Sequence, residues 1–166
     1  MTVTLTAATA EYADAVAQLR NASARALTTK HGPGAWSGQC TARGVHFDQR
    51  TGQVWLARLG EQTVATLKLA AKKPWAIDRS YFSPVARPVY LTALAVAPEF
   101  QSRGVGRACL EQAVHLAREF PADAICLDAF DHPAAGAGEF YRKCGFRETG
   151  RKVYHGVPLV YFEMLL

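Results

Sequence analysis

The chain has 166 residues, of which 49% are hydrophobic and 20% are charged, and its formal net charge is +5. This length suffices for one well-buried core and is too short for two ordinary domains, so we expect residues 1–166 to form a single domain. No apolar run approaches the roughly eighteen residues of a membrane span, and the N-terminus lacks the features of a signal peptide, which predicts a cytoplasmic protein without membrane association.

The cysteines and the charges exclude further classes. The four cysteines are widely spaced without a C-x-x-C pair, which argues against a metal site and against a disulfide framework. The cations are scattered, and the longest basic run is Lys72-Lys73, so we expect no nucleic-acid partner. A polyphosphate ligand accounts for the positive surplus equally well.

The N-terminal third predicts one strand and one or two helices. Alternating threonine and apolar residues indicate a half-buried strand over residues 2–6. A helix is expected over residues 9–27, because Thr9 can cap it and apolar residues recur at helical spacing. Residues 28–38, rich in Gly, Pro and His, predict a loop, followed by a short helix over 39–49.

The middle of the chain predicts a hairpin and a long loop. Two runs rich in β-formers, residues 54–59 and 64–69, flank a turn at 60–63, which is typical of an antiparallel hairpin. Prolines interrupt the following stretch, which also carries aromatic residues. Long loops of this kind within a compact domain are often functional.

The C-terminal half alternates strands and helices. Residues 89–97 are almost continuously apolar, which predicts a central strand covered on both faces. A helix follows the next glycines, with Val105, Cys109, Ala113, Leu116 and Phe120 on one buried stripe. We then expect a buried strand over 124–130, a helix over 134–144 and two final strands over 146–154 and 158–165, with parallel pairing around two strand-helix-strand crossovers.

The glycines at the start of the helix predict an anion site. The pattern is Gln101-x-x-Gly104-x-Gly106, flanked by Arg103 and Arg107. The first N–H groups of a helix have no partner within the helix, and the macrodipole adds partial positive charge there, so a phosphate fits. Glycine lets the backbone approach such a ligand closely.

Two other phosphate-binding loops are excluded. A P-loop requires Gly-Lys-Ser/Thr, which does not follow these glycines. A dinucleotide-binding loop requires a third glycine where this chain has Cys109, and the residues that remain are too few for a doubly wound domain.

Placed after the strand segment 94–96 and a Pro98-Glu99 turn, the pattern resembles the pyrophosphate loop of the Gcn5-related N-acetyltransferases. The resemblance covers residues 50–150, and the order of elements matches over the whole chain. It implies an α/β acyl-CoA N-acyltransferase fold, a mixed and mostly antiparallel sheet of six to seven strands flanked by about four helices. It also implies acetyl-CoA as the cofactor, bound by the residues Leu94, Ala95, Val96, Gln101, Ser102, Arg103, Gly104, Val105, Gly106, Arg107, Asp131 and Tyr141.

The resemblance extends to a second signature, Phe140-Tyr141-Arg-Lys-Cys-Gly145-Phe146. In the family, its tyrosine is assigned as the acid that protonates the departing thiolate, a role that falls here to Tyr141. A phenol is chemically suited to that donation. The family also implies a central strand that is opened by a bulge and whose backbone pairs with the pantetheine.

The base for the attacking amine is not assigned. Many relatives place a glutamate on the central strand, where this chain has Tyr90, Thr92 and Leu94. The acid candidates are Asp128, within a buried strand, and Glu99 and Asp131, in turns beside it. Asp128 is the foremost, because a carboxylate within a buried strand is costly unless it is paired or near a wet cleft. A structural carboxylate bonded to its neighbours is the alternative for Asp128.

The implied activity is transfer of the acetyl group of acetyl-CoA to a primary amine by direct attack. We expect a small-molecule acceptor, in contact with Trp36, Trp75, Tyr81 and Tyr154, because the loops that build the family's acceptor pocket are aromatic here. A protein or peptide acceptor is the alternative within this activity. A coenzyme A-binding regulatory module without turnover is the alternative outside it. The oligomeric state is left open, a homodimer included.

Overall fold

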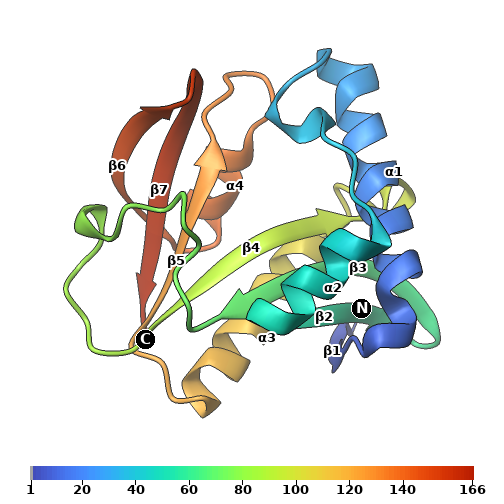
Figure 1. Cartoon of the computed structure of the whole chain (residues 1–166), viewed down its shortest axis with the longest axis horizontal. Coiled ribbons are helices and arrows are strands. Elements are labelled where there is room, and N and C mark those ends of the chain that lie inside the picture. The colour runs from blue at the N-terminus through green and yellow to red at the C-terminus, as the bar shows by residue number, and fades with distance from the viewer. Residues whose placement is uncertain (1) are drawn as a thin grey trace.

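The computed structural model describes residues 2–166, which form one mixed sheet and four α-helices (Figure 1). The strands are β1 (Thr4–Ala7), β2 (Gln53–Leu59), β3 (Gln62–Ala70), β4 (Pro88–Val96), β5 (Ala124–Phe130), β6 (Arg147–Tyr154) and β7 (Val157–Leu165). The helices are α1 (Ala13–His31), α2 (Ala42–Thr51), α3 (Val105–Glu119) and α4 (Ala137–Lys143). The strand order is β1-β2-β3-β4-β5-β7-β6, which confirms the expected α/β fold with a seven-stranded sheet.

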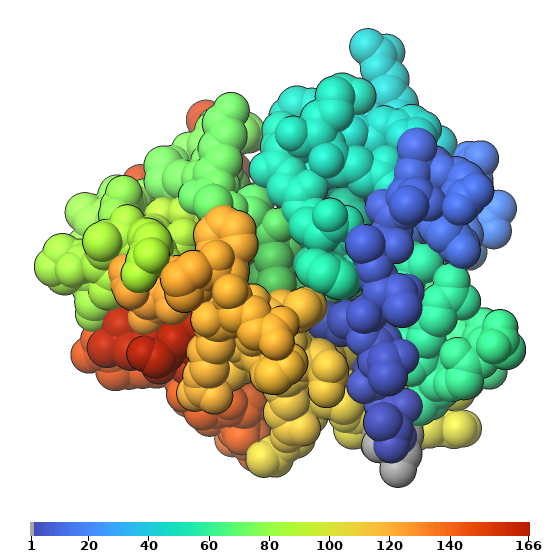
Figure 2. Space-filling model, turned by 90° about the horizontal axis from the view of Figure 1, so that it is seen from below, coloured from blue at the N-terminus to red at the C-terminus, as the bar shows by residue number. Residues whose placement is uncertain are grey.

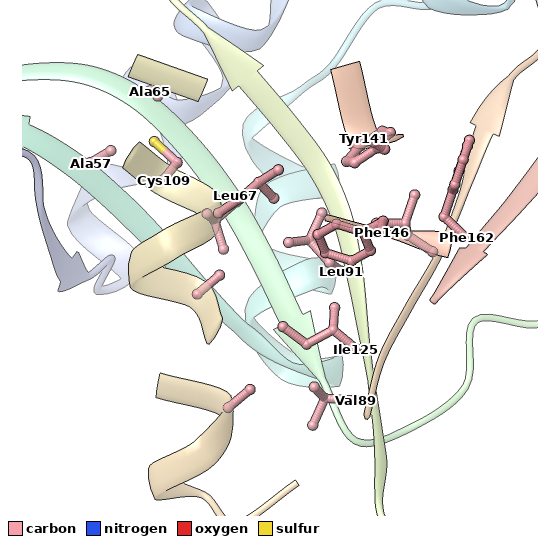
Figure 3. Close-up of a cluster of buried hydrophobic side chains, with 14 of the residues drawn as sticks. Ala57, Ala65, Leu67, Val89, Leu91, Cys109, Ile125, Tyr141, Phe146 and Phe162 are labelled. Carbon is pink, nitrogen blue, oxygen red and sulfur yellow. The ribbon is translucent and has the colours of Figure 1, made fainter. Parts of the chain in front are cut away.

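Helices cover both faces of the sheet. Helices α1 and α2 lie on one face, where Val16, Val45 and Leu56 share a buried cluster. Helix α3 lies on the other face, and its Cys109 belongs to the larger core with Leu91 and the side chains drawn in Figure 3. Burying one such side chain contributes about 1.5–3 kcal/mol to folding. The sheet is therefore held as the middle layer of three.

The two halves of the sheet meet at one short parallel contact. β4 pairs with β5 only through Pro88–Tyr90 and Ala124–Cys126, and beyond these residues the two strands separate. The expected second parallel pair is wrong, because β7 turns back from β6 and pairs antiparallel with β5 along its whole length. The sheet therefore has a gap between β4 and β5 beyond Tyr90 and Cys126.

Most expected elements are present, although several of their boundaries differ. Helix α1 continues to His31, the turn between β2 and β3 has only two residues, Gly60 and Glu61, and α4 begins at Ala137. Gly60 has φ +58°, which suits a tight hairpin turn. Phe120 was expected on the buried stripe of α3 but is 61% exposed, because the helix ends before it and Pro121 follows.

The long loop before β4 is fastened to the outer half of the sheet. Ile77 and Phe82 pack against the buried ring of Tyr161. The Glu163 carboxylate, 1% exposed, accepts hydrogen bonds from Ser83 N (2.8 Å) and Ser83 Oγ (2.6 Å), and it pairs with Arg147. Burial opposes ionisation of Glu163, but these bonds prevail and lower its pKa. These contacts fix the loop against β7 and β6.

A second cavity lies at the end of the molecule that Figure 2 shows, where α3 ends and β4 begins. It has a volume of about 510 Å³ and is lined by Trp55, Leu69, Val89 and Leu116 among others. None of its lining residues belongs to the sequence-predicted site.

Candidate active site

The separation of β4 and β5 opens a cleft in the middle of the sheet. A bulge begins the opening: Leu67 of β3 faces two residues of β4, and Ala93 has φ +53°. A non-glycine residue in this conformation is strained, and such strain concentrates at functional sites. The bulge that the family resemblance implied is thus present at Ala93 and Leu94.

A cavity of about 730 Å³ occupies the cleft on the α3 and α4 face. Of the residues expected to hold the cofactor, those that line this cavity are Leu94, Val96, Gln101, Ser102, Gly104, Gly106, Arg107 and Tyr141. Residues far apart in the sequence therefore meet at one site.

The glycine loop forms the N-terminus of α3. Gly104 caps the helix with φ +82°, a conformation that glycine adopts without strain. The first backbone bond of this helix runs from Ala108 N to Gly104 O (3.0 Å), so the N–H groups of residues 105–107 have no carbonyl partner within it. Ser102, with φ +58°, completes the turn. Several N–H donors and the positive end of the helix dipole thus meet beside the cavity.

Gly106 is a point of close approach. A Cβ at this position would lie 3.1 Å from Phe140 Cζ, so the glycine lets α3 and α4 approach at the cavity wall. The Gln101 amide has a structural role, because its Nε2 donates to Val96 O (3.0 Å) and Ser23 Oγ (3.4 Å). It ties the loop to β4 and α1.

Four residues predicted to contact the cofactor lie outside this cavity. Val105 is buried in the core, and Ala95 lines another cavity on the α1 face. Arg103 lies over the Phe100 ring at 5.8 Å, and Asp131 pairs with Arg151 at 2.7 Å. The sequence patterns predicted which segments lie near the cofactor cavity. They did not predict which side chains of these segments line it.

Tyr141 is held at the cavity wall by the core. It is 9% exposed and packs against Phe140, Phe146 and Phe162, as Figure 3 shows for the latter two. Burial raises the pKa of Tyr141 well above its usual value, and nearby Asp128 and Cys144 raise it further. The phenol therefore keeps its proton at neutral pH and can donate it.

Asp128 lies at the opening between the two halves of the sheet. Its strand partner in β7 is Tyr161, and its charge raises the pKa of both Tyr161 and Tyr141. Burial raises the pKa of Asp128 itself, and a hydrogen bond from its own backbone N–H opposes this shift. One carboxylate thus influences the cofactor cavity and the opposite face of the sheet.

The four residues expected at the acceptor site are in three places. Trp36 packs against the end of β5 and the turn after it, with ring centroids 5.2 Å from both Phe130 and His132. Tyr81 stacks on Tyr161 at 4.6 Å within the outer cluster. Trp75, 82% exposed, and Tyr154 form an edge contact at 5.7 Å beside the last hairpin. The four do not form one pocket.

His132 fixes the conformation of the segment before α4. Its ring Nδ1 accepts hydrogen bonds from Ala134 N and Ala135 N, both at 3.1 Å. These bonds shape the turn that brings small residues to the cavity. The cavity residues absent from the sequence-based list are Ala135, Gly136, Ala137, Phe140, Lys143 and Cys144. Helical spacing from Tyr141 was the available signal for Ala137, four residues before it, and Cys144, three residues after it.

Comparisons with known proteins agree with this geometry. Residues 50–148 match the family model described as an acetyltransferase (GNAT) domain, so the chain belongs to the Gcn5-related N-acetyltransferase family. A search of curated proteins found no significant match.

Solved structures share the fold at low sequence identity. A GNAT-family acetyltransferase from Listeria monocytogenes has a TM-score of 0.77 and 17% identity, covering 99% of this chain and 95% of that one. The ribosomal-protein-S18-alanine N-acetyltransferase from Escherichia coli has a TM-score of 0.72 and 15% identity, with coverages of 98% and 93%. A putative acetyltransferase from Salmonella typhimurium, solved with its cofactor acetyl-CoA, has a TM-score of 0.68 and 16% identity, with coverages of 100% and 95%.

Two further findings concern residues 2–166. No helix in this range combines the length and apolar character that a bilayer crossing requires. No group of three or more His, Cys, Asp or Glu side chains in the same range is arranged to hold a metal ion.

Proposed function

We propose that the protein is an acetyl-CoA-dependent N-acetyltransferase that modifies a small primary amine. The single observation that carries this proposal is the cleft between β4 and β5, which has free helix N–H groups at one end and Tyr141 in its wall. Asp128 lies on β5 beyond the segment that pairs with β4, and its charge raises the pKa of Tyr141. The family supplies the reaction class. The geometry supplies residues for each requirement of that reaction.

The residues present fit acetyl-CoA. The α3 N-terminus would hold the pyrophosphate through the N–H groups of residues 105–107, at a loop where Gly104 and Gly106 leave room. Arg107 and Lys143 line the same cavity and add positive charge. The bulged segment at Leu94 and Val96 offers backbone groups to an extended pantetheine, as an added strand does. When bound, acetyl-CoA supplies a thioester carbonyl carbon for the amine to attack and a thiolate as leaving group.

Tyr141 and Asp128 divide the proton transfers. An alkylamine is largely protonated at neutral pH and must lose a proton before it attacks. Asp128 takes that proton, directly or through water, because it lies at the opening and its ionised form is the base. Tyr141 would give its phenolic proton to the departing sulfur and would regain one, through water, from the nitrogen, which loses its second proton as the amide forms. The amine gains an acetyl group, and the thiol is released.

A steady-state assay that measures free thiol tests the proposal. The purified protein is mixed with acetyl-CoA and a panel of small amines, and a peptide with a free N-terminus is included to test the protein-acceptor alternative. We expect acceptor-dependent thiol release and an acetylated product of the expected mass. Binding of acetyl-CoA without thiol release for every acceptor would favour the regulatory module and overturn the enzyme.

A further inference from the structure

A third cavity, separate from the cofactor cavity and from the one at the end of α3, lies against the bulge of β4 on the face opposite the cofactor cleft. It has a volume of about 370 Å³, and its lining includes Arg20, Ala24 and Leu27 of α1, Trp36, and residues 93–95 of β4. Leu94 lines this cavity and the cofactor cleft alike. A molecule in this cavity would therefore lie next to the proposed thioester position, so the inference below rests on the proposed function.

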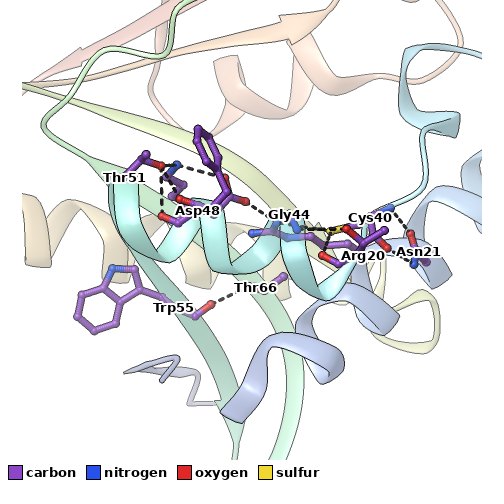
Figure 4. A network of polar contacts seen from close by, with 11 residues as sticks. Arg20, Asn21, Cys40, Gly44, Asp48, Thr51, Trp55 and Thr66 are labelled. Carbon is purple, nitrogen blue, oxygen red and sulfur yellow. Dashed lines mark hydrogen bonds and ion pairs between the residues drawn. The ribbon is translucent and has the colours of Figure 1, made fainter. Parts of the chain in front are cut away.

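The wall of this cavity belongs to a charged network with an excess of positive charge (Figure 4). Arg20 Nη1 donates to Asp48 Oδ2 (2.7 Å), and Lys68 Nζ donates to Asp48 Oδ1 (3.2 Å) and Thr51 Oγ1 (2.6 Å). The side chains of Arg20 and Lys68 are each 11% exposed, and that of Asp48 is 23% exposed. Two largely buried cations thus share one carboxylate, which leaves one positive charge without a counterion in the network.

Arg20 also has unused donors. Its Nε and Nη2 atoms are buried and make no hydrogen bond to any other group in residues 2–166. A buried donor without a partner is unfavourable, and native structures rarely contain one without a reason. A guanidinium binds a carboxylate through two parallel N–H bonds, one of them commonly from Nε or the second Nη. Protein atoms cover Nε and Nη2, so a ligand in the cavity meets Arg20 at the part of its side chain that lines the wall. A carboxylate there is the group that balances the excess positive charge of the network.

The other polar side chains near Arg20 are already engaged. Asn21 donates from Nδ2 to Cys40 O (2.8 Å) and accepts from Cys40 N (2.7 Å) at Oδ1. Ala24, Leu27 and Trp36 make the remaining wall small or apolar. The cavity thus combines one charged position with a limited apolar surface.

We propose that the acceptor is a small amino acid-like molecule, an amine that also bears a carboxylate. The carboxylate pairs with Arg20, the apolar part lies against Leu27 and Trp36, and the amine faces Leu94 and the acetyl group. The volume suits a single amino acid rather than a folded protein surface. Arg20 is then a specificity-determining residue of the reaction.

Matched acceptors test this inference directly. The thiol-release assay compares leucine with leucinamide and 3-methylbutylamine, and phenylalanine with phenylalaninamide and 2-phenylethylamine. Within each set the amine and side chain are kept, and only the carboxylate is altered or removed. We expect kcat/KM to be about 10- to 100-fold higher for the amino acid, as for a gain of charge-assisted hydrogen bonds. Equal or better turnover of the amides and the carboxylate-free amines would overturn the inference.

The Arg20→Gln variant identifies the residue responsible. Asp48 keeps Lys68 as a partner in this variant, so no carboxylate is left uncompensated. We expect the KM for the amino acid to rise about 10- to 100-fold and the KM for the matched amide to stay the same. Arg25→Gln is the control, because Arg25 is an exposed cation on the same helix, one turn further along. An equal loss in both variants, or none in Arg20→Gln, would contradict the assignment.

A binding measurement separates this inference from the proposed function. Calorimetry with N-acetylleucine and N-acetyl-3-methylbutylamine reports the carboxylate preference without any turnover. If no amine releases thiol but N-acetylleucine binds selectively and Arg20→Gln abolishes that binding, the carboxylate site stands and the enzyme proposal fails. If thiol release occurs but neither measurement distinguishes the carboxylate, the enzyme stands and this inference fails.

Discussion

The two sides of β4 offer different kinds of groups to the ligands that we propose for them. On the α3 side the binding groups are backbone N–H groups at the helix start and the backbone of the bulged strand, brought close by Gly104 and Gly106. On the α1 side they are side chains, with Arg20 from one helix and Trp36 from the following loop. A backbone site depends on space and conformation, whereas a side-chain site depends on which residues occupy a few positions.

This difference predicts how each side responds to substitution. The α3 side should tolerate changes of side-chain charge and fail when the space is filled. The α1 side should keep its shape when a residue is exchanged and change its preference for the acceptor. Each prediction below tests one of these expectations.

Filling the backbone site should have the largest effect. Gly106→Glu places bulk at a position where a Cβ already approaches Phe140 Cζ to 3.1 Å, and it adds a negative charge beside the free N–H groups. We expect the affinity for acetyl-CoA to fall more than about 100-fold, a loss of over about 2.7 kcal/mol. Calorimetric titration with coenzyme A measures it.

Gly44→Glu is the matched control, because Gly44 lies in the first turn of α2 and a Cβ there meets only Thr41 Oγ1, at 3.5 Å. Its cofactor affinity should equal that of the unaltered protein. Near-normal affinity in Gly106→Glu would refute the assignment of the pyrophosphate loop.

Removing the acid should affect turnover and leave binding intact. Tyr141→Phe keeps the ring among Phe140, Phe146 and Phe162 and removes only the hydroxyl. We expect kcat to fall about 100-fold, the scale of general acid catalysis, with little change in the dissociation constant of acetyl-CoA. Single-turnover and binding measurements separate the two quantities. Unchanged kcat would remove Tyr141 as the acid, and Tyr12→Phe serves as the control for loss of a remote hydroxyl.

Removing the base should lower activity and raise stability. Burial raises the pKa of Asp128, so ionisation of this group costs the folded state more than the unfolded one. The folded state therefore binds more protons at pH values between the ordinary and the raised pKa, and stability falls as pH rises through that window. Asp128→Asn should raise Tm at neutral pH, and the gain should vanish below the ordinary carboxyl range.

The same variant has a kinetic signature. We expect kcat/KM of Asp128→Asn to fall on the order of 10- to 100-fold, and the rise of activity with pH that reflects Asp128 ionisation to disappear. Pairing the pH–rate profile with thermal unfolding tests both statements. A variant that loses stability and keeps its pH profile would mean that Asp128 is a structural carboxylate.

The features that could be predicted from the sequence lie mainly on the α3 side of β4. The order of elements, the central strand and the glycine loop were predictable, because each depends on residues that are close in the chain. Leu94, Gly104, Gly106 and Tyr141 could accordingly be named from local patterns, and the structure brings them to one cavity. Their binding roles stay predictions.

The acceptor side was less predictable for a physical reason. Trp75 is an exposed aromatic residue in a long loop, and the sequence contains no sign that it lies beside Tyr154 and apart from Trp36. No sequence pattern around Arg20 indicated a binding role. Its proposed role depends on the ion pairs of Asp48 with Arg20 and Lys68, and Asp48 and Lys68 lie 28 and 48 residues after Arg20 in the chain. Contacts between residues that are far apart in the chain determine the shape and charge of such a pocket. A short sequence pattern contains no information about these contacts.

The smallest effect should come from a charged side chain on the backbone side. Arg107 lines the cofactor cleft, but it is 64% exposed and already pairs with Glu111 at 3.2 Å. Exposed charges contribute little because water and salt screen them, so Arg107→Gln should weaken acetyl-CoA binding by only about 2- to 5-fold. Titration at low and high salt checks this expectation, since the difference between the two proteins should shrink as salt rises. Arg118→Gln, near the far end of α3, controls for the change in net charge. A loss of 100-fold would mean that the arginine, rather than the helix N-terminus, holds the anion, and the contrast between the two sides of β4 would then no longer hold.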